Sequence, residues 1–273
     1  MESHLEELCL PFNVEPIYCT TREHCEECCQ LLLSKPVWGF DCEWKVSYEK
    51  GVNHPVALIQ FACADIIILL HIHVIGEITP GLNSVLKRSD VFKVGVNINN
   101  DVTKLRRSFP NISSDIGGVC DLRSVYKGVT NMKSPRSLAA LVSTELNKEL
   151  PKPHSTRCGN WELVPLTRSQ IAYAALDAYA SYLVFQAIRC RVGVTSSGPE
   201  ALDFLLPFSA PTGPALRPLT RHIKTLPVET PPGTPMAQKT AVAAPRTISP
   251  RRLSQATGNA IGKAVIAELP ICP

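Results

Sequence analysis

Three short apolar segments follow one another early in the chain, and their succession limits the possible fold more than any other feature. They cover residues 37–44, 56–62 and 66–71, and polar or turn-forming residues separate them. Apolar runs of this length between turn signals indicate β-strands. We therefore predict a protein built on a β-sheet.

Helices and strands alternate after these segments. Two further strands are predicted at 92–96 and 118–122, and helices at 22–34, 80–87, 100–108, 135–144 and 168–189. The last helix has the clearest start, because Thr167 and Gln170 match a capping box. Three strands in succession and then helix–strand–helix units favour an α/β fold, a mixed sheet of about five strands with helices on its faces.

The composition changes near residue 192. Of the 23 prolines, 13 lie beyond it, together with many Ser, Thr and Ala residues. The same part holds 8 of the 28 Lys and Arg residues and 4 of the 24 Asp and Glu residues, so 20 charges of each sign precede it. We predict an N-terminal extension at 1–21, a folded domain at 22–192 and a basic, disordered tail at 193–273.

The 11 cysteines show no regular spacing, and the first residues lack a signal-peptide pattern. We therefore expect an intracellular protein with free thiols. The sequence His24-Cys25-x-x-Cys28-Cys29 suggests zinc, but a second ligand pair is not evident, and its helical character favours an ordinary helix. The chain has no apolar run of 18 residues, so we expect no membrane partner. The net charge of +4 does not by itself indicate a nucleic-acid partner.

Two acids lie in the first apolar segment, in the order Phe40-Asp41-Cys42-Glu43-Trp44. Alternate side chains of a strand lie on the same face, so Asp41 and Glu43 are predicted to point together. Two neighbouring carboxylates repel each other, and a divalent cation is a usual compensator. The alternative is a solvated strand edge, although the apolar flanks favour a central strand.

A third acid, Asp101, follows the strand at 92–96 and an Asn-rich turn. It is predicted at or just inside the start of a helix. By itself it is best interpreted as an N-cap. Asn97, Asn99 and Asn100 can also cap, which leaves Asp101 free for another role.

Tyr173 and Asp177 lie four residues apart on the last helix and therefore share one face. Alanines surround them, so the same face also fits a helix core. An aspartate on a mostly apolar face needs a partner, and a metal ion is a suitable one. Three acid-bearing segments together are typical of a two-metal site, in which clustered carboxylates hold ions that promote phosphodiester cleavage.

The chain resembles the DEDDy 3′–5′ exonucleases, in the branch close to the Werner syndrome exonuclease domain. The resemblance covers about residues 36–190 and rests on the segments WGFDCEW, HPVALIQFA, VFKVGVNINNDVTKL, CDLRSV, SLAALV and RCGNWELVPLTRSQIAYAALDAYASYLVF. The first motif of the family matches Asp41 and Glu43, the second matches Asp101, and the third matches Tyr173 and Asp177.

This resemblance implies a ribonuclease H-like fold with two Mg²⁺ or Mn²⁺ ions bound by the four acids. It implies that Tyr173 orients the attacking water and that nucleoside 5′-monophosphates are released from a 3′ end. Four further positions in the matching segments are candidate substrate contacts: Trp44, Leu138, Arg157 and Trp161. For the two tryptophans, core packing is the alternative to base stacking.

The similarity favours DNA as the substrate, and a nuclear location with a role in DNA repair. An exoribonuclease similar to ribonuclease D and a non-catalytic nucleic-acid-binding scaffold are the alternatives. The chain has no G-x-x-x-x-G-K-[ST] motif, so a helicase acting with it is expected to be a separate protein. No small-molecule cofactor is expected.

Overall fold

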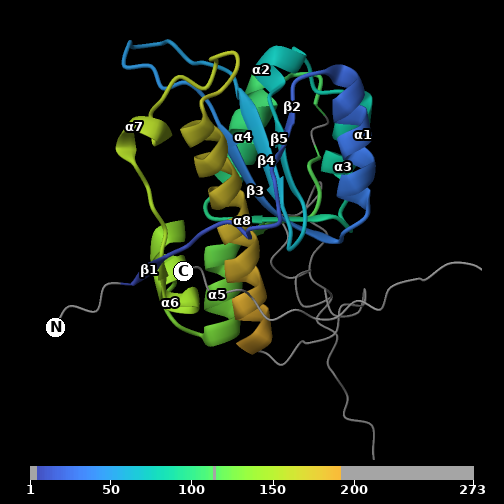
Figure 1. Ribbon diagram of the computed structural model, residues 1–273. Helices are drawn as coiled ribbons and strands as arrows, with labels where there is room; N and C mark the ends of the chain where they lie inside the picture. The colour runs from blue at the N-terminus through green and yellow to red at the C-terminus, as the bar shows by residue number, and fades with distance from the viewer. Residues whose placement is uncertain (1–4, 113–114, 192–273) are drawn as a thin grey trace, which may run out of the picture. The chain divides into compact units, whose positions relative to one another are not determined.

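A six-stranded mixed sheet forms the centre of the computed structural model, which describes residues 5–112 and 115–191 (Figure 1). In spatial order the strands are β2 (Ile17–Cys19), β5 (Ile67–Leu70), β4 (Leu58–Ala62), β3 (Val37–Glu43), β6 (Phe92–Gly95) and β7 (Val119–Asp121). Strands β3, β4 and β5 pair antiparallel, whereas the β2–β5, β3–β6 and β6–β7 pairs are parallel. This arrangement confirms the predicted α/β fold with a mixed sheet.

The sheet has one strand more than expected, and that strand comes from residues that we predicted to lie outside the domain. Residues 17–19 pair with residues 68–70, so the boundary predicted at residue 22 is wrong. A second, two-stranded sheet joins β1 (Glu6–Glu7) to β8 (Lys148–Glu149). Strands of two or three residues are too short to show a period, which is why the sequence did not reveal them. The predicted tail at 193–273 lies outside the described residues.

One face of the sheet is covered by α1 (Arg22–Leu33), α3 (Pro80–Lys87) and α4 (Ile98–Ser108). Their apolar residues share one core cluster with Trp38, Phe40 and Phe61 of the sheet. The three cysteines of α1 are buried in this cluster, in agreement with the helix predicted there. Figure 1 shows α1 and α3 side by side on this face.

The opposite face is covered by α8 (Arg168–Arg191), with α5 (Leu122–Thr130) and α6 (Leu138–Leu146) beside it (Figure 1). The predicted capping box is confirmed: Gln170 N donates to Thr167 Oγ1 at 3.2 Å, and Thr167 N donates to Gln170 Oε1 at 3.1 Å. Helix α8 has the length and apolar composition of a membrane span, but much of it is buried within the fold, as a core helix is. Two short helices, α2 (Ile72–Ile75) and α7 (His154–Arg157), complete the described elements.

Gly39 allows α8 to lie unusually close to β3. A Cβ atom at this position would lie 1.9 Å from the carbonyl oxygen of Ala178 and 2.7 Å from the backbone nitrogen of Tyr182. Any larger residue would therefore push the helix away from the strand. Since Asp177 precedes Ala178, this close approach determines how near the α8 carboxylate comes to those of β3.

Candidate active site

Strand β3 presents two carboxylates to the face that α8 covers. Phe40 and Cys42 point into the core cluster on the other face, so Asp41 and Glu43, which alternate with them, lie on the α8 side. The pairing of β3 with β4 on one side and β6 on the other makes it a central strand. The alternative of a solvated edge strand is therefore wrong.

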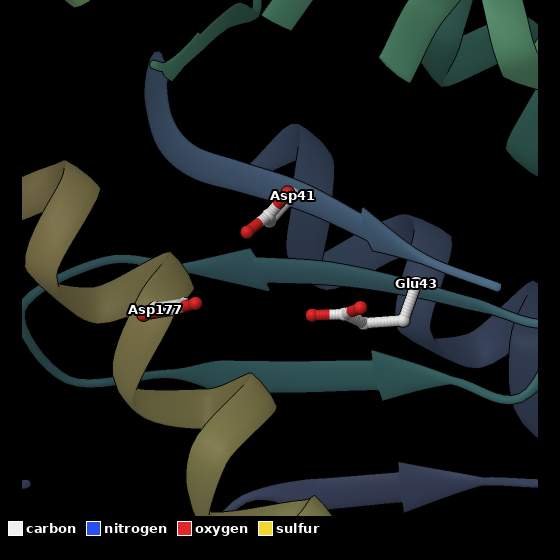
Figure 2. Close-up of side chains that lie close together, drawn as sticks. All are labelled: Asp41, Glu43 and Asp177. Atoms are coloured by element: carbon white, nitrogen blue, oxygen red, sulfur yellow. The ribbon is translucent and has the colours of Figure 1, made fainter. Parts of the chain in front are cut away.

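Asp177 of α8 completes a compact cluster with these two acids. One carboxylate oxygen from each of Asp41, Glu43 and Asp177 lies within 4.8 Å of the others. Figure 2 shows the three side chains converging from β3 and α8. Oxygen ligands gathered at this spacing can hold a hard divalent cation.

Asp101 approaches the same cluster from α4. The helix begins directly after Asn97, whose left-handed backbone (φ 62°) turns the chain at the end of β6. Asn97 occupies the N-cap position, so Asp101 lies inside the first turn and is not the cap. Asp101 is buried, and the charge of Asp41 contributes to the rise in its pKa, but Asp101 is not among the three acids whose ligand oxygens lie within 4.8 Å of one another.

The electrostatics of these acids favour a bound cation. Burial, reinforced by Asp177, raises the pKa of Asp41 to about 7. Burial and the charge of Asp41 raise the pKa of Asp101 to about 9. The pKa of Glu43 also lies well above its usual value, first because of burial and then because of Asp41. Grouped carboxylates that are reluctant to ionise gain most from a positive ion between them.

Lys152 supplies a positive charge at one side of the cluster. Its Nζ lies 3.6 Å from Asp177 Oδ2. Burial raises the pKa of Asp177, and the charge of Lys152 opposes that rise. Lys152 lies between two prolines in a segment without periodicity, so no sequence signal indicated its position.

Tyr173 lies one helical turn before Asp177 and is almost fully buried. Burial and the neighbouring carboxylates raise the pKa of the Tyr173 hydroxyl, so the group stays protonated and can donate a hydrogen bond. Its ring packs against Trp161, with 6.1 Å between the ring centroids. The Trp161 side chain is fully buried, so the core-packing alternative holds for this residue and base stacking is wrong.

A hydrogen-bond chain holds the segment that carries Trp161. The Trp161 carbonyl oxygen accepts from His71 Nε2 at 3.1 Å, which leaves His71 Nδ1 to accept from the Tyr18 hydroxyl at 2.6 Å. The Tyr18 oxygen in turn accepts from the Leu166 backbone N–H at 3.3 Å. Strands β2 and β5 are thereby tied to the loop against which Tyr173 packs. The sequence did not single out Tyr18 or His71, because each is an isolated polar residue.

A cavity of about 230 Å³ opens beside Asp41. Leu138 lies on its wall, next to the side chains of Arg136 and Lys152. The predicted substrate contact Leu138 thus lines the same cavity as Asp41 and two basic residues.

The other two predicted contacts lie close to the acids. Arg157 is the exposed last residue of α7, and its charge, like that of Lys152, opposes the rise in the pKa of Asp177 that burial causes. Trp44 directly follows Glu43, but its ring packs partly against the core and lies 5.1 Å beneath the Lys104 ammonium. Trp44 therefore presents a cation above its ring and not a bare aromatic face.

A ribonuclease H-like sheet with acids from β3, α4 and α8 defines the class of 3′–5′ exonuclease domains. The 3′–5′ exonuclease family model matches residues 16–192, so this chain belongs to that family. The match begins at β2, in agreement with the structure.

Curated relatives include the mouse bifunctional 3′–5′ exonuclease/ATP-dependent helicase WRN, 34% identical over 60% of this chain and 12% of the relative. An Arabidopsis thaliana 3′–5′ exonuclease is 36% identical over 55% of this chain and 52% of the relative. This chain thus spans about half or less of the relatives' length. The crystal structure of the Aedes aegypti Nibbler EXO domain has a TM-score of 0.60 at 22% identity and covers 71% of this chain and 97% of that domain, which supports the fold.

Proposed function

We propose that this protein is a divalent-metal-dependent exonuclease that removes nucleotides from the 3′ end of a nucleic acid. The observation that carries the proposal is the convergence of Asp41, Glu43 and Asp177, whose ligand oxygens lie within 4.8 Å of one another. Asp101 and Tyr173 interact electrostatically with members of this cluster. A non-catalytic scaffold would have no need for a group of partly or fully buried acids that raise one another's pKa.

Asp41, Glu43, Asp101 and Asp177 would hold two divalent ions, Mg²⁺ or Mn²⁺. They come from three elements, β3, α4 and α8. Bound ions would supply a hydroxide nucleophile at neutral pH and stabilise the leaving oxygen of the phosphodiester. The protein contributes by holding the acids in place before the ions arrive.

Other side chains bind and orient the reactants. The protonated Tyr173 hydroxyl donates a hydrogen bond to the attacking water. Lys152 and Arg157 lie on the Asp177 side of the cluster, where they can contact the phosphate that is cleaved. Trp161 and the Tyr18–His71 pair keep Tyr173 in position.

The proposed substrate is DNA, on the resemblance to the Werner-like branch. RNA is the alternative, since discrimination between the sugars depends on how the 2′-hydroxyl is accommodated. A time course with matched DNA and RNA oligonucleotides, labelled at the 3′ or 5′ end and supplied with Mg²⁺ or Mn²⁺, tests both. We expect the 5′-labelled strand to shorten stepwise and the 3′ label to appear as a mononucleotide. Faster loss of the RNA strand would contradict the proposed sugar preference.

Asp177→Ala is expected to lower the rate by roughly 10²- to 10³-fold or more, because it removes one metal-binding carboxylate. Circular dichroism should show an intact fold. The control is Asp90→Ala, which removes an exposed acid that pairs with Arg88 in the connection between α3 and β6. Wild-type rates in Asp177→Ala would contradict the assignment of the site. Absence of any metal-dependent product from the wild-type chain would contradict the proposed activity.

A further inference from the structure

Helix α4 gathers positive charge on a surface that begins at the candidate active site. It carries Lys104, Arg106 and Arg107, whereas its one acid, Asp101, is buried and interacts electrostatically with Asp41. The chain before the predicted tail holds equal numbers of acidic and basic residues, so this local excess is not a general property of the domain.

Two of these cations continue outward from Asp101 along the helix. Residues 101, 104 and 107 follow one another at intervals of three and form a ridge on the helix surface. Asp101 is buried, Lys104 is half-buried and Arg107 is exposed, so the ridge leads from the carboxylates to the solvent. The rise of an α-helix makes it about 9 Å long.

Lys104 is held in a defined place. Its Nζ donates to Asn53 Oδ1 and lies 5.1 Å from the centroid of the Trp44 ring. The end of α4 is fixed to the same β3–β4 connection, because the Val56 N–H donates to Ser108 Oγ at 2.9 Å. Since Trp44 directly follows β3, the Lys104 ammonium is fixed near the end of the strand that carries Glu43.

The charge on this ridge has no acidic partner among residues 5–112 and 115–191: no ion pair forms with Lys104, Arg106 or Arg107. Glu162, which faces the neighbouring connection, is occupied by Lys45 at 3.7 Å and His54 at 2.8 Å. Burial and the charge of Arg107 lower the pKa of Lys104. Two close cations without an acid are stabilised by a bound anion.

We propose that Lys104 and Arg107 bind the phosphodiester backbone of the substrate strand on the 5′ side of the scissile bond. This inference rests on the proposed function, because it takes the 3′ end to lie at the carboxylates. The ridge carries two cations and no bare aromatic ring, since Lys104 covers Trp44. It therefore binds phosphates without regard to base sequence.

The test measures binding of the full chain to a single-stranded, fluorescent DNA oligonucleotide by anisotropy over a range of salt concentrations without divalent metal. In the double variant Lys104→Gln/Arg107→Gln, the slope of log Kd against log salt should become shallower by about 1.4, at about 0.7 per lost contact. The matched control is Lys87→Gln/Lys127→Gln, which removes two exposed helical cations elsewhere and should keep the wild-type slope.

A second measurement distinguishes an effect on strand binding from an effect on hydrolysis at the carboxylates. Thymidine 5′-(p-nitrophenyl phosphate) has no strand beyond one nucleotide, so it depends on the metal site and not on the ridge. The ratio of kcat/KM for the oligonucleotide to kcat/KM for this ester should fall about tenfold in the double variant, the effect of about 1.4 kcal/mol of lost binding. Arg107→Gln alone changes only an exposed side chain and should give about half the change in salt slope.

An unchanged salt slope in the double variant, or an equal change in the control, would overturn the proposal. A wild-type chain that binds the oligonucleotide through the ridge but hydrolyses neither substrate would contradict the proposed function and leave the binding surface supported. If both substrates are hydrolysed but the kcat/KM ratio in the double variant equals that of the wild type, the proposed function is supported and the binding role of the ridge is contradicted.

Discussion

Tyr18 shows how a residue distant in sequence supports the candidate site. Its hydroxyl connects His71 to the Leu166 N–H, and His71 binds the carbonyl of Trp161, whose ring packs on Tyr173. None of these supporting groups touches the carboxylates. Their common effect is to restrict where the Tyr173 hydroxyl can lie, which classes Tyr18 and His71 as positioning residues.

Tyr18→Phe tests this arrangement. The variant leaves His71 Nδ1 and the Leu166 N–H without their partner, which should lower the free energy of unfolding by about 1–3 kcal/mol. We expect kcat to fall about tenfold with little change in KM, because the reacting water is misplaced while the substrate contacts persist. Steady-state kinetics measure this division.

The control for this variant is Tyr48→Phe, since the Tyr48 side chain is 87% exposed. It loses the same hydroxyl group without disturbing a buried partner. A Tyr18→Phe enzyme that is less stable but has wild-type kcat would show that the hydrogen-bond chain supports the fold alone.

The contact between α8 and β3 is the feature at the scale of elements on which the site most depends. Strand β3 supplies Asp41 and Glu43, helix α8 supplies Asp177 and Tyr173, and Gly39 permits their close contact. The two elements are far apart in the sequence, so their distance depends on packing. A small residue on the strand thus contributes to the geometry of the acid cluster without belonging to it.

Gly39→Ala should separate α8 from β3, because the new Cβ would lie 1.9 Å from a backbone oxygen that cannot rotate away. We expect a loss of about 3 kcal/mol in the free energy of unfolding, at the upper end for overpacking. Nuclease activity should fall by about 10²-fold, as displacements of about 1 Å do at active sites. Denaturant melts and initial rates measure the two effects.

Gly128→Ala is the matching control, since Gly128 is exposed on α5 and alanine is favoured in helices. It should keep or slightly increase stability and leave the initial rate as it is. Equal behaviour of the two variants would show that α8 does not need the close approach at Gly39.

At the scale of the whole molecule, the carboxylate cluster should make stability depend on pH and on metal. Burial raises the pKa of Asp41 to about 7 and that of Asp101 to about 9, above their usual value of 3.8. Between the usual pKa of 3.8 and these raised values, the folded, metal-free protein binds more protons than the unfolded chain. Its stability therefore falls as pH rises from about 4 towards 9.

Divalent metal should reverse this trend, because the ions bind the ionised acids. We expect Mn²⁺ to raise Tm more at pH 8 than at pH 6, by at least a few degrees, since about 1 kcal/mol shifts the Tm of a domain of this size by roughly 2–4 °C. Thermal melts with Mn²⁺ or with a chelator measure the difference.

Asp41→Asn provides the comparison for this prediction, because it removes one of the coupled acids and keeps the shape of the side chain. Without metal it should be more stable than the wild type at pH 8 and similar to it at pH 4. A variant that still gains the full stabilisation from Mn²⁺ at pH 8 would contradict the placement of the ion at Asp41.

The sequence by itself determined the main strands and the long capped helix, because their signals are local, and the family resemblance predicted the five motif residues. Strand alternation predicted that Asp41 and Glu43 share a face, and helical spacing predicted the same of Tyr173 and Asp177. Strand β2 was missed because three residues show no period, and the N-terminal boundary was misplaced with it.

Only the tertiary structure decided which distant residues surround these motifs. Lys152 beside Asp177, the Tyr18–His71–Trp161 connection and the Lys104 ammonium above Trp44 all join residues from separate elements. Such contacts depend on how helices pack on the sheet, and Gly39 permits the close approach of α8 because it has no Cβ atom, which no periodic pattern records. Secondary structure follows from neighbouring residues, whereas the environment of a charged group follows from the whole fold.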